Sequence, residues 1–312
     1  MSISAFLGSR QPLDVLGDDY LTDPARHLHN AAGGKPIIRY PELNLWVVLD
    51  HTLCERVLTN WQDFSNRGNG SEIPIPARHQ QAFPQELLSQ IFTAMDPPLH
   101  ATARRAAQQG FSQGRMETLI PQIEDRANRI IDRLEEQGQA NLLESYCLEL
   151  TTQTLLALMD LPHEYDTVMR QLRDDWFMIL GSTVSQIPEP QDTEVWERFA
   201  ATQQQLRKLV DQRRKNPGTD LISDMASATD EDGQPALSAE RIAIHLAEFA
   251  AAGTDTTAQA MANALLFLDD HEGVRQQAMD EDLWEEVFEE TIRRRPSATF
   301  AARQATSDME LG

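Results

Sequence analysis

The chain has 312 residues, and its 41% hydrophobic and 24% charged residues are typical of a globular protein with a large core. Its formal net charge of -22 argues against a nucleic-acid partner, because the basic surface that neutralises phosphates is missing. No secretory signal opens the chain, and no apolar run approaches the roughly 20 residues that span a bilayer. We therefore expect a cytoplasmic protein with no membrane partner.

The N-terminal part combines a small β region with short helices. Residues 36–40 and 45–49 are rich in β-formers and flank the turn sequence P-E-L-N, which predicts an antiparallel hairpin. Residues 50–58 and 86–92 have helical patterns, whereas residues 66–78 are rich in Gly, Asn, Ser and Pro. That composition predicts a long irregular loop, and loops of this length are often functional.

A proline-containing motif, M-D-P-P-L-H-A-T-A-R-R from Met95, predicts the start of a helix. Asp96 is suited to cap the helix, and Pro97 is suited to its first position. His100 and Arg104 are then four residues apart on one face, where they can hold a carboxylate of a ligand. A solvated basic face near a helix start is the alternative for this motif taken alone.

Four amphipathic or apolar helices follow, over residues 120–136, 142–159, 163–180 and 194–215. The third ends in the apolar sequence W-F-M-I-L, and the polar loop 181–193 separates it from the fourth. A helix, loop and helix with an apolar rim predict a movable cover over a pocket. A plain surface hairpin is the alternative.

The longest predicted helix covers residues 237–268 and is mostly Ala, Ile, Leu, Phe and Met, as in a helix surrounded by protein. Ser238 can cap its start, and Glu240 is favourable near the positive end of the helix dipole. The polar residues fall on one side and must find partners in a buried setting. They are His245, Glu248, Asp255, Thr256, Gln259 and Asn263.

The centre of this helix, A-G-T-D-T-T from Ala252 to Thr257, contains weak helix formers, which predicts a local bulge. Small Ala251, Ala252 and Gly253 would let a large flat ligand approach the backbone. A long core helix with satisfied hydroxyl groups is the alternative interpretation.

Two further helices are predicted at residues 272–279 and 283–295. Glu290 and Arg293 form an E-x-x-R pair on the second, a pattern that indicates little by itself because exposed pairs of this kind are common. Arg303 lies in a segment that is predicted to be extended.

Four motifs therefore occur in order: D-P-P-x-H-x-x-x-R, A-G-x-D-T-T, E-x-x-R-x-R-P, and a lone Arg before A-T-S-D-M-E-L-G. This order resembles the cytochrome P-450 family of haem-thiolate monooxygenases in its soluble bacterial form, and the resemblance covers the whole chain. It implies a mainly α fold with a small β region, organised as a single domain over residues 1–312 whose C-terminal part is missing. It also implies haem, iron protoporphyrin IX, between the central helix and a proximal helix.

The resemblance implies roles for individual residues. Asp255 and Thr256 match the acid-alcohol pair beside the oxygen site, where the carboxylate relays protons and the hydroxyl orders a water, away from bulk solvent. Glu290 and Arg293 match a buried structural pair that braces the proximal side. Thr102 stands where many relatives carry Arg. The residues expected at haem are His100, Arg104 and Arg303 at its propionates, and Ala252 and Gly253 against its plane.

The same resemblance implies that one atom of O2 is inserted into a small-to-medium apolar organic substrate, with electrons from a ferredoxin or flavoprotein. We expect the electron donor to dock near Arg104, Arg105 and Arg115. Residues 66–92 and 176–196 supply the substrate pocket in relatives, and their apolar and aromatic composition favours an apolar molecule.

The family's haem ligand is a Cys in a Phe-x-x-Gly-x-x-x-Cys-x-Gly loop, and this loop does not occur in the sequence. Cys54 and Cys147 lack its Phe and Gly context and give neither a disulfide framework nor metal-ligand spacing, so we predict structural thiols and no metal ligand. The leading hypothesis is a monooxygenase whose ligand segment is encoded beyond Gly312. The alternatives are a non-catalytic binding or scaffold relative and an acidic helical protein unrelated to the family.

Overall fold

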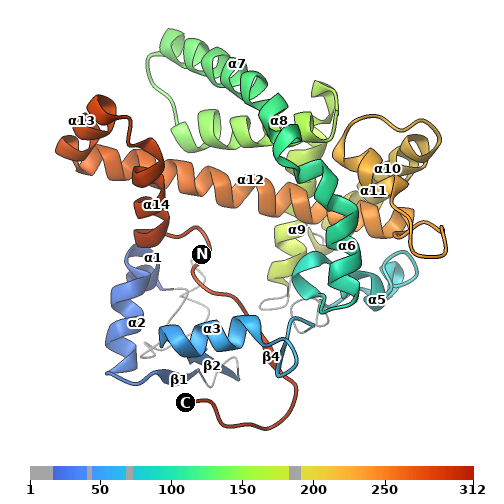
Figure 1. Ribbon diagram of the computed structural model, residues 1–312, viewed down its shortest axis with the longest axis horizontal. Helices are drawn as coiled ribbons and strands as arrows, with labels where there is room; N and C mark the ends of the chain where they lie inside the picture. Colours follow the sequence, from blue (N-terminus) through green and yellow to red (C-terminus); the bar gives the residue numbers. More distant parts are fainter. Residues whose placement is uncertain (1–16, 41–43, 68–72, 183–190) are drawn as a thin grey trace. The chain divides into compact units, whose positions relative to one another are not determined.

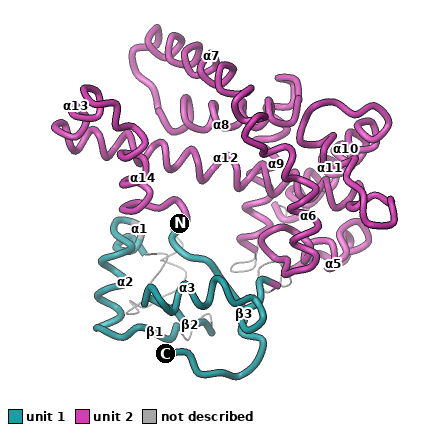
Figure 2. Tube along the Cα trace, viewed as in Figure 1, with its two compact units in different colours: residues 1–66, 299–312 teal, residues 67–298 magenta. Residues whose placement is uncertain are grey.

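The structure of the protein is a computed structural model, in which the chain divides into two compact units (Figures 1 and 2). The described residues are 17–40, 44–67, 73–182 and 191–312. Unit 1 contains residues 1–66 and 299–312, and unit 2 contains residues 67–298. The expectation of a single domain over residues 1–312 stays a prediction.

Unit 1 joins short helices to two small antiparallel sheets. The predicted hairpin is confirmed, because Ile37 pairs with Val48 in antiparallel register; its turn residues 41–43 lie outside the described residues. The second sheet pairs β3 with β4, from opposite ends of the sequence. The elements are α1 Asp18–Thr22, α2 Pro24–Ala32, β1 Ile37–Tyr40, β2 Leu45–Val48, α3 His51–Thr59, β3 Phe64–Ser65 and β4 Gln304–Ala305.

Unit 2 is built from helices around α12, with α8, α9, α10 and α14 packed against it (Figure 1). Its helices are α5 Gln85–Leu88, α6 Leu99–Gln108, α7 Gln113–Gln137, α8 Leu148–Leu158, α9 Asp166–Gly181, α10 Gln191–Lys215, α11 Leu221–Ser227, α12 Ala239–Asp270, α13 Glu272–Glu281 and α14 Trp284–Arg294. Short 3-10 turns include Phe92–Ala94, and a π-helical turn, Leu143–Cys147, precedes α8. The expected mainly α fold with a small β region is confirmed. None of the described helices is long and apolar enough to cross a membrane.

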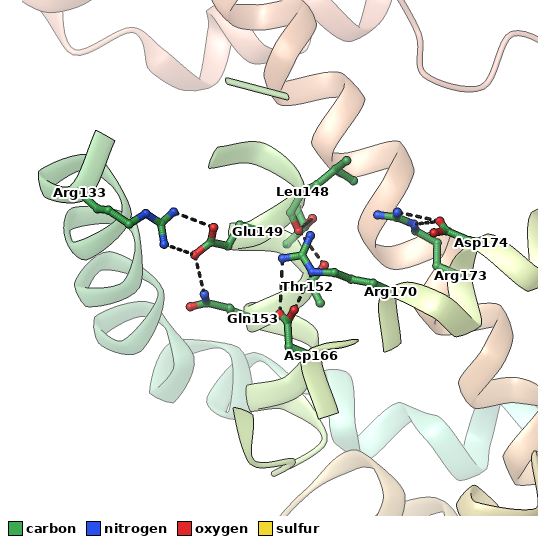
Figure 3. A network of polar contacts seen from close by, with 10 residues as sticks. Arg133, Leu148, Glu149, Thr152, Gln153, Asp166, Arg170, Arg173 and Asp174 are labelled. Carbon is green, nitrogen blue, oxygen red and sulfur yellow. Dashed lines mark hydrogen bonds and ion pairs between the residues drawn. The ribbon is translucent and has the colours of Figure 1, made fainter. Parts of the chain in front are cut away.

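A polar network on the surface of unit 2 ties α7 to α8 (Figure 3). Arg133 of α7 donates to both carboxylate oxygens of Glu149 of α8, at 2.9 and 2.7 Å, and Gln153 donates to the same carboxylate at 3.0 Å. Nearby, Arg170 pairs with Asp166 within α9 at 2.7 Å. The two-point geometry between Arg133 and Glu149 fixes their relative orientation better than a single contact would.

The start of α12 is confirmed, and its first half forms the centre of the unit 2 core. The Ser238 hydroxyl accepts a hydrogen bond from the Arg241 backbone N–H at 3.2 Å. Beyond this cap, Ile242, Ile244 and Leu246 are fully buried. Burial of such side chains is the main source of stability for a helix in this position.

The bulge predicted at residues 252–257 is wrong, because α12 is an uninterrupted α-helix. Thr254 Oγ1 donates to the Ala250 carbonyl at 2.5 Å, and Thr256 Oγ1 donates to the Ala252 carbonyl at 2.7 Å. Each carbonyl oxygen has two lone pairs, so it can accept the hydroxyl together with the backbone N–H, and both hydroxyl groups are satisfied without interrupting the helix.

Helix α6 begins two residues later than predicted, and Pro98 rather than Asp96 immediately precedes it. Pro97 precedes another proline, and a residue in that position disfavours the helical conformation, so the helix begins after Pro98. The Asp96 carbonyl still accepts the His100 backbone N–H at 3.1 Å. The Asp96 carboxylate is buried and lies 3.7 Å from the Arg67 guanidinium.

The predicted cover corresponds to α9 and α10, which enclose an aromatic cluster. Trp176 of α9 and Trp196 of α10 are both buried, and their ring centroids lie 5.8 and 6.2 Å from that of Phe199. The expectation that these Trp residues lie at the apolar rim of a pocket is therefore wrong, because their large rings are stabilised by packing inside unit 2. Phe177 is exposed, and residues 183–190 of the predicted loop lie outside the described residues.

Candidate functional site

Accessibility changes along α12 at Ala252. The helix is mostly buried up to Ala251, whereas Ala252 and Gly253 are exposed. A Cβ added at Gly253 would meet no atom within 4 Å. Two small residues are therefore accessible here, so that a ligand could approach the helix backbone directly.

Asp255 and Thr256 lie beside this opening, and both are partly exposed. Asp255 Oδ2 accepts a hydrogen bond from the Gln259 amide at 2.5 Å. Because Thr256 Oγ1 donates its proton to the Ala252 carbonyl, the oxygen keeps acceptor capacity toward solvent. The Thr256 carbonyl accepts the Ser297 hydroxyl at 2.6 Å, which ties the segment after α14 to this part of α12. The pair thus offers a carboxylate and a hydroxyl group suited to holding and passing protons.

His100 and Arg104 lie one turn apart on α6, His100 partly exposed and Arg104 exposed. The edge of the His100 ring faces Phe92, with 6.4 Å between ring centroids. Across the part of the chain that the structure describes, no carboxylate forms an ion pair with Arg104. Arg303 belongs to unit 1, where its Nη1 donates to the adjacent Ala302 carbonyl at 2.7 Å. Its expected role at a propionate stays a prediction.

Glu248 is a buried carboxylate of α12 whose partners the sequence did not indicate. It is 4% exposed, and it accepts hydrogen bonds from the Phe92 backbone N–H at 2.7 Å and the Thr93 backbone N–H at 2.9 Å. The Thr93 hydroxyl donates to it as well, at 2.9 Å. A glutamate in an apolar helix face signals that a partner exists, but not which distant segment supplies it. Glu248 thereby joins the 3-10 turn Phe92–Ala94 to α12.

His245 is fully buried one turn earlier. Its ring centroid lies 4.3 Å from that of Phe92, and its Nδ1 lies 3.7 Å from Glu248 Oε2, which is beyond hydrogen-bond distance. Within the described residues neither ring nitrogen has a hydrogen-bond partner. Burial lowers the pKa of His245. Glu248 raises this pKa, but by less than burial lowers it, and Arg241 contributes a smaller further lowering.

The lowered pKa predicts that His245 makes stability depend on pH. As pH falls, the His245 imidazole takes up a proton in the unfolded chain before it does so in the folded protein. The stability contributed by the neutral imidazole is therefore complete above about pH 6.5. Below that pH, the free energy of unfolding decreases by up to about 1.4 kcal/mol per pH unit. In His245→Phe this dependence disappears. The free energy of unfolding of the wild type minus that of the variant, measured in urea between about pH 7.5 and 5, should therefore decrease toward low pH. A constant difference would contradict the assignment.

The E-x-x-R pair on α14 forms, but it lies on the surface. Arg293 donates to both carboxylate oxygens of Glu290 at 2.6 and 2.7 Å, and Arg294 donates at 2.7 Å. Side-chain exposure is 37% for Glu290 and 67% for Arg293, so the expectation of a buried pair is wrong for the described structure. On α14 the buried residues are instead Val287 and Thr291. Hydrogen bonds from Arg293 and Arg294 lower the pKa of Glu290 to about 2.

The basic residues expected to meet an electron donor differ in their surroundings. Arg104 and Arg105 are exposed on α6. Arg115 instead donates to Asp224 at 3.3 Å, and the two side chains are 17% and 18% exposed. Arg115 thus joins α7 to α11 within unit 2, and its charge is already paired with Asp224. The expected docking of an electron donor near these residues stays a prediction.

Comparison with known proteins identifies relatives of this chain. The family model for Cytochrome P450 matches residues 25–312. Cyclomarin C epoxidase CymV of Salinispora arenicola is 31% identical over 225 residues, which are 70% of this chain and 55% of that protein. Cytochrome P450 monooxygenase PikC of Streptomyces venezuelae is 26% identical over 266 residues, which are 83% of this chain and 59% of that protein. The chain therefore spans less than two thirds of the length of these curated relatives.

A solved structure shares the fold. Cytochrome P450epoK bound to epothilone D aligns with a TM-score of 0.80 and 20% sequence identity, covering 97% of this chain and 74% of that one. At this identity the likeness concerns the fold alone, and it confirms the expected helical architecture. Because the family model matches from residue 25 to residue 312, the chain belongs to the cytochrome P450 family.

Proposed function

We propose that this protein is a haem-dependent monooxygenase that inserts one atom of O2 into a small-to-medium apolar organic substrate, with electrons from a ferredoxin or flavoprotein. Members of the cytochrome P450 family bind haem, iron protoporphyrin IX. The observation that carries the proposal is the opening on α12 at Ala252 and Gly253, with Asp255 and Thr256 beside it, in a chain that matches the family over residues 25–312.

The described residues fit most of a haem site. The open space at Gly253 would accept a flat macrocycle, and a side chain at this position would fill that space. His100 and Arg104 offer two donors on one face of α6 for a propionate. Neither cysteine fits the axial ligand, because Cys147 is fully buried and the Cys54 thiol donates to a backbone carbonyl at 3.3 Å. Burial raises the pKa of both thiols, which disfavours the thiolate form that binds iron.

The proposed mechanism assigns proton handling to Asp255 and Thr256. Haem, when bound, supplies the activation of dioxygen. The Gln259 amide orients the Asp255 carboxylate through Oδ2, so that Oδ1 can take up and release a proton. Thr256 Oγ1, whose proton is directed to the Ala252 carbonyl, accepts a hydrogen bond from a water and holds it next to Asp255. Protons would thus reach the oxygen site through one ordered water and not through bulk solvent.

Haem uptake by the purified protein tests this proposal. We expect the wild type to bind hemin, followed by absorbance and by quenching of tryptophan fluorescence. Arg104→Ala should bind about tenfold more weakly, since a charge-assisted hydrogen bond is worth about 1.5–3 kcal/mol. Arg105→Ala is the matched control, because Arg105 is the adjacent, equally charged and exposed residue of α6. Equal affinities for the wild type and Arg104→Ala would show that α6 does not hold a propionate.

A non-catalytic binding protein is the second candidate, and the surroundings of Cys54 and Cys147 favour it. A version carrying a family thiolate segment after Gly312 separates the two candidates. The carbon monoxide difference spectrum of thiolate-ligated haem, together with product formation, would support the monooxygenase. In that version Thr256→Ala should consume oxygen and electrons with less product, whereas haem binding without turnover would support the binding protein.

A further inference from the structure

Glu248 makes three hydrogen bonds to one short turn of the chain. Its Oε2 accepts the Phe92 backbone N–H at 2.7 Å, and its Oε1 accepts both the Thr93 backbone N–H and the Thr93 hydroxyl at 2.9 Å. A carboxylate that is 4% exposed is tolerated only when its oxygens are hydrogen-bonded in this way. We name these contacts between Glu248, Phe92 and Thr93 the Glu248 clamp.

Phe92 extends the Glu248 clamp to His100. Its ring packs against His245 and Phe249 of α12, with centroid distances of 4.3 and 5.3 Å. The His100 ring meets it edge-on, with an interplanar angle of 88° and a centroid distance of 6.4 Å. Aromatic contacts of this type restrict the orientation of both rings. The backbone and the ring of Phe92 are therefore both held by α12, and the ring in turn borders the imidazole at the start of α6.

The Glu248 clamp also lies next to the opening on α12. Glu248 precedes Ala252 by one helical turn, and the turn Phe92–Ala94 leads within five residues to α6. The two helices that carry the proposed haem contacts are thus fastened to each other at a point close to both contacts.

We propose that Glu248 is a positioning residue, which fixes α6 to α12 through Phe92 and Thr93 and so sets the separation between His100 and Gly253 across the haem-binding space. This inference rests on the proposed haem function. Glu248 does not itself reach that space, because its carboxylate is buried and all three of its hydrogen bonds go to the turn.

Variants of the clamp test this role. Glu248→Gln keeps the size of the side chain but replaces one acceptor oxygen by an NH2 group, so at least one bond to the turn is lost. We expect faster hydrogen exchange of the Phe92 and Thr93 backbone amides and about tenfold weaker hemin affinity, as for other residues that orient a ligand-holding group. Thr93→Val, which lacks the hydroxyl, should have a smaller effect in the same direction, and Thr93→Ser should behave as the wild type.

Ser223→Ala provides a control for stability alone. Ser223 is buried in unit 2, donates to Asp220 Oδ2 at 2.6 Å and accepts the Gly218 backbone N–H at 2.8 Å. It belongs to α11, which carries no proposed haem contact. We compare hemin affinity between Glu248→Gln and Ser223→Ala when both lose the same amount of thermal stability. If Glu248 contributed only to stability, the two variants would bind hemin equally well, whereas a positioning role predicts weaker binding by Glu248→Gln.

The possible outcomes separate this inference from the proposed function. A wild type that does not bind hemin, even when a family thiolate segment follows Gly312, overturns the proposed function, and the positioning role falls with it. A wild type that binds hemin and a Glu248→Gln variant that binds equally well overturn the positioning role alone. If Glu248→Gln leaves the hydrogen exchange of the Phe92 and Thr93 backbone amides unchanged, the clamp itself is overturned as well. If Glu248→Gln does not fold, Thr93→Val is compared with Thr93→Ser. Weaker hemin binding by Thr93→Val than by Thr93→Ser supports the positioning role, and equal binding overturns it.

Discussion

Replacing Gly253 with Leu should leave the protein folded while weakening hemin binding by about tenfold to a hundredfold, since filling the ligand space should cost about 1–3 kcal/mol. A Cβ at this position meets no atom within 4 Å, so the new side chain extends into open space and not into the core. Leu is also a better helix former than Gly by roughly 0.8 kcal/mol. Urea unfolding should therefore show equal or higher stability, and a hemin titration should show the loss of affinity.

Gly114→Leu is the matched control for this prediction. Gly114 lies in the first turn of α7, is exposed, and also has open space around its Cβ position. Its replacement should leave hemin affinity unchanged. Gly253→Ala should fall between the wild type and Gly253→Leu, because it adds only one methyl group. If Gly253→Leu binds hemin as tightly as the wild type, the opening on α12 is not the haem surface.

Phe199→Ala should destabilise unit 2 by about 3–5 kcal/mol, the usual cost of removing a fully buried aromatic ring. The Phe199 ring contacts Phe83, Trp176 and Trp196 at centroid distances of 5.2, 5.8 and 6.2 Å, and it has no exposed surface. Its removal leaves a cavity between α9 and α10 that neighbouring rings fill only in part. Urea unfolding followed by tryptophan fluorescence measures the loss directly, because both contacting Trp residues report on this cluster.

Phe177→Ala is the control for ring removal in the same helix pair. Phe177 belongs to α9 and is 41% exposed, so its replacement should change stability by well under half of the Phe199→Ala effect. Similar losses for the two variants would mean that the aromatic cluster is not the stabilising core of α9 and α10.

Several elements could be predicted because their signals act within a few residues. The Ser238 cap was predicted from the residue type and its place before an apolar helix, and its hydroxyl accepts the N–H three residues later. The antiparallel pairing of β1 with β2 was predicted from two β-rich runs around a short turn. In such cases the interacting groups are close in sequence, so their contact requires little information about the rest of the fold.

Other expectations failed where contacts between distant segments decide the outcome. The Trp residues of α9 and α10 were expected at a pocket rim, but they lie in the unit 2 core because Phe199 and Phe83 surround them. The ion-pair partner of Arg115 was likewise not predicted, because Asp224 lies 109 residues further along the chain. Composition and spacing indicate that a side chain is apolar or charged, and they do not indicate which segment will cover it.

For the candidate site, the sequence by itself determined the chemical groups and their helices: Asp255 and Thr256 on α12, and His100 and Arg104 one turn apart on α6. Helical periodicity is a local property, so it places such residues on a common face without further information. Only the tertiary structure decided that α12 is unbroken, that it becomes accessible at Ala252, and that Glu248 is joined to the turn before α6. The reason is that accessibility and the partner of a buried charge depend on segments that are far apart in the chain and meet only when it folds.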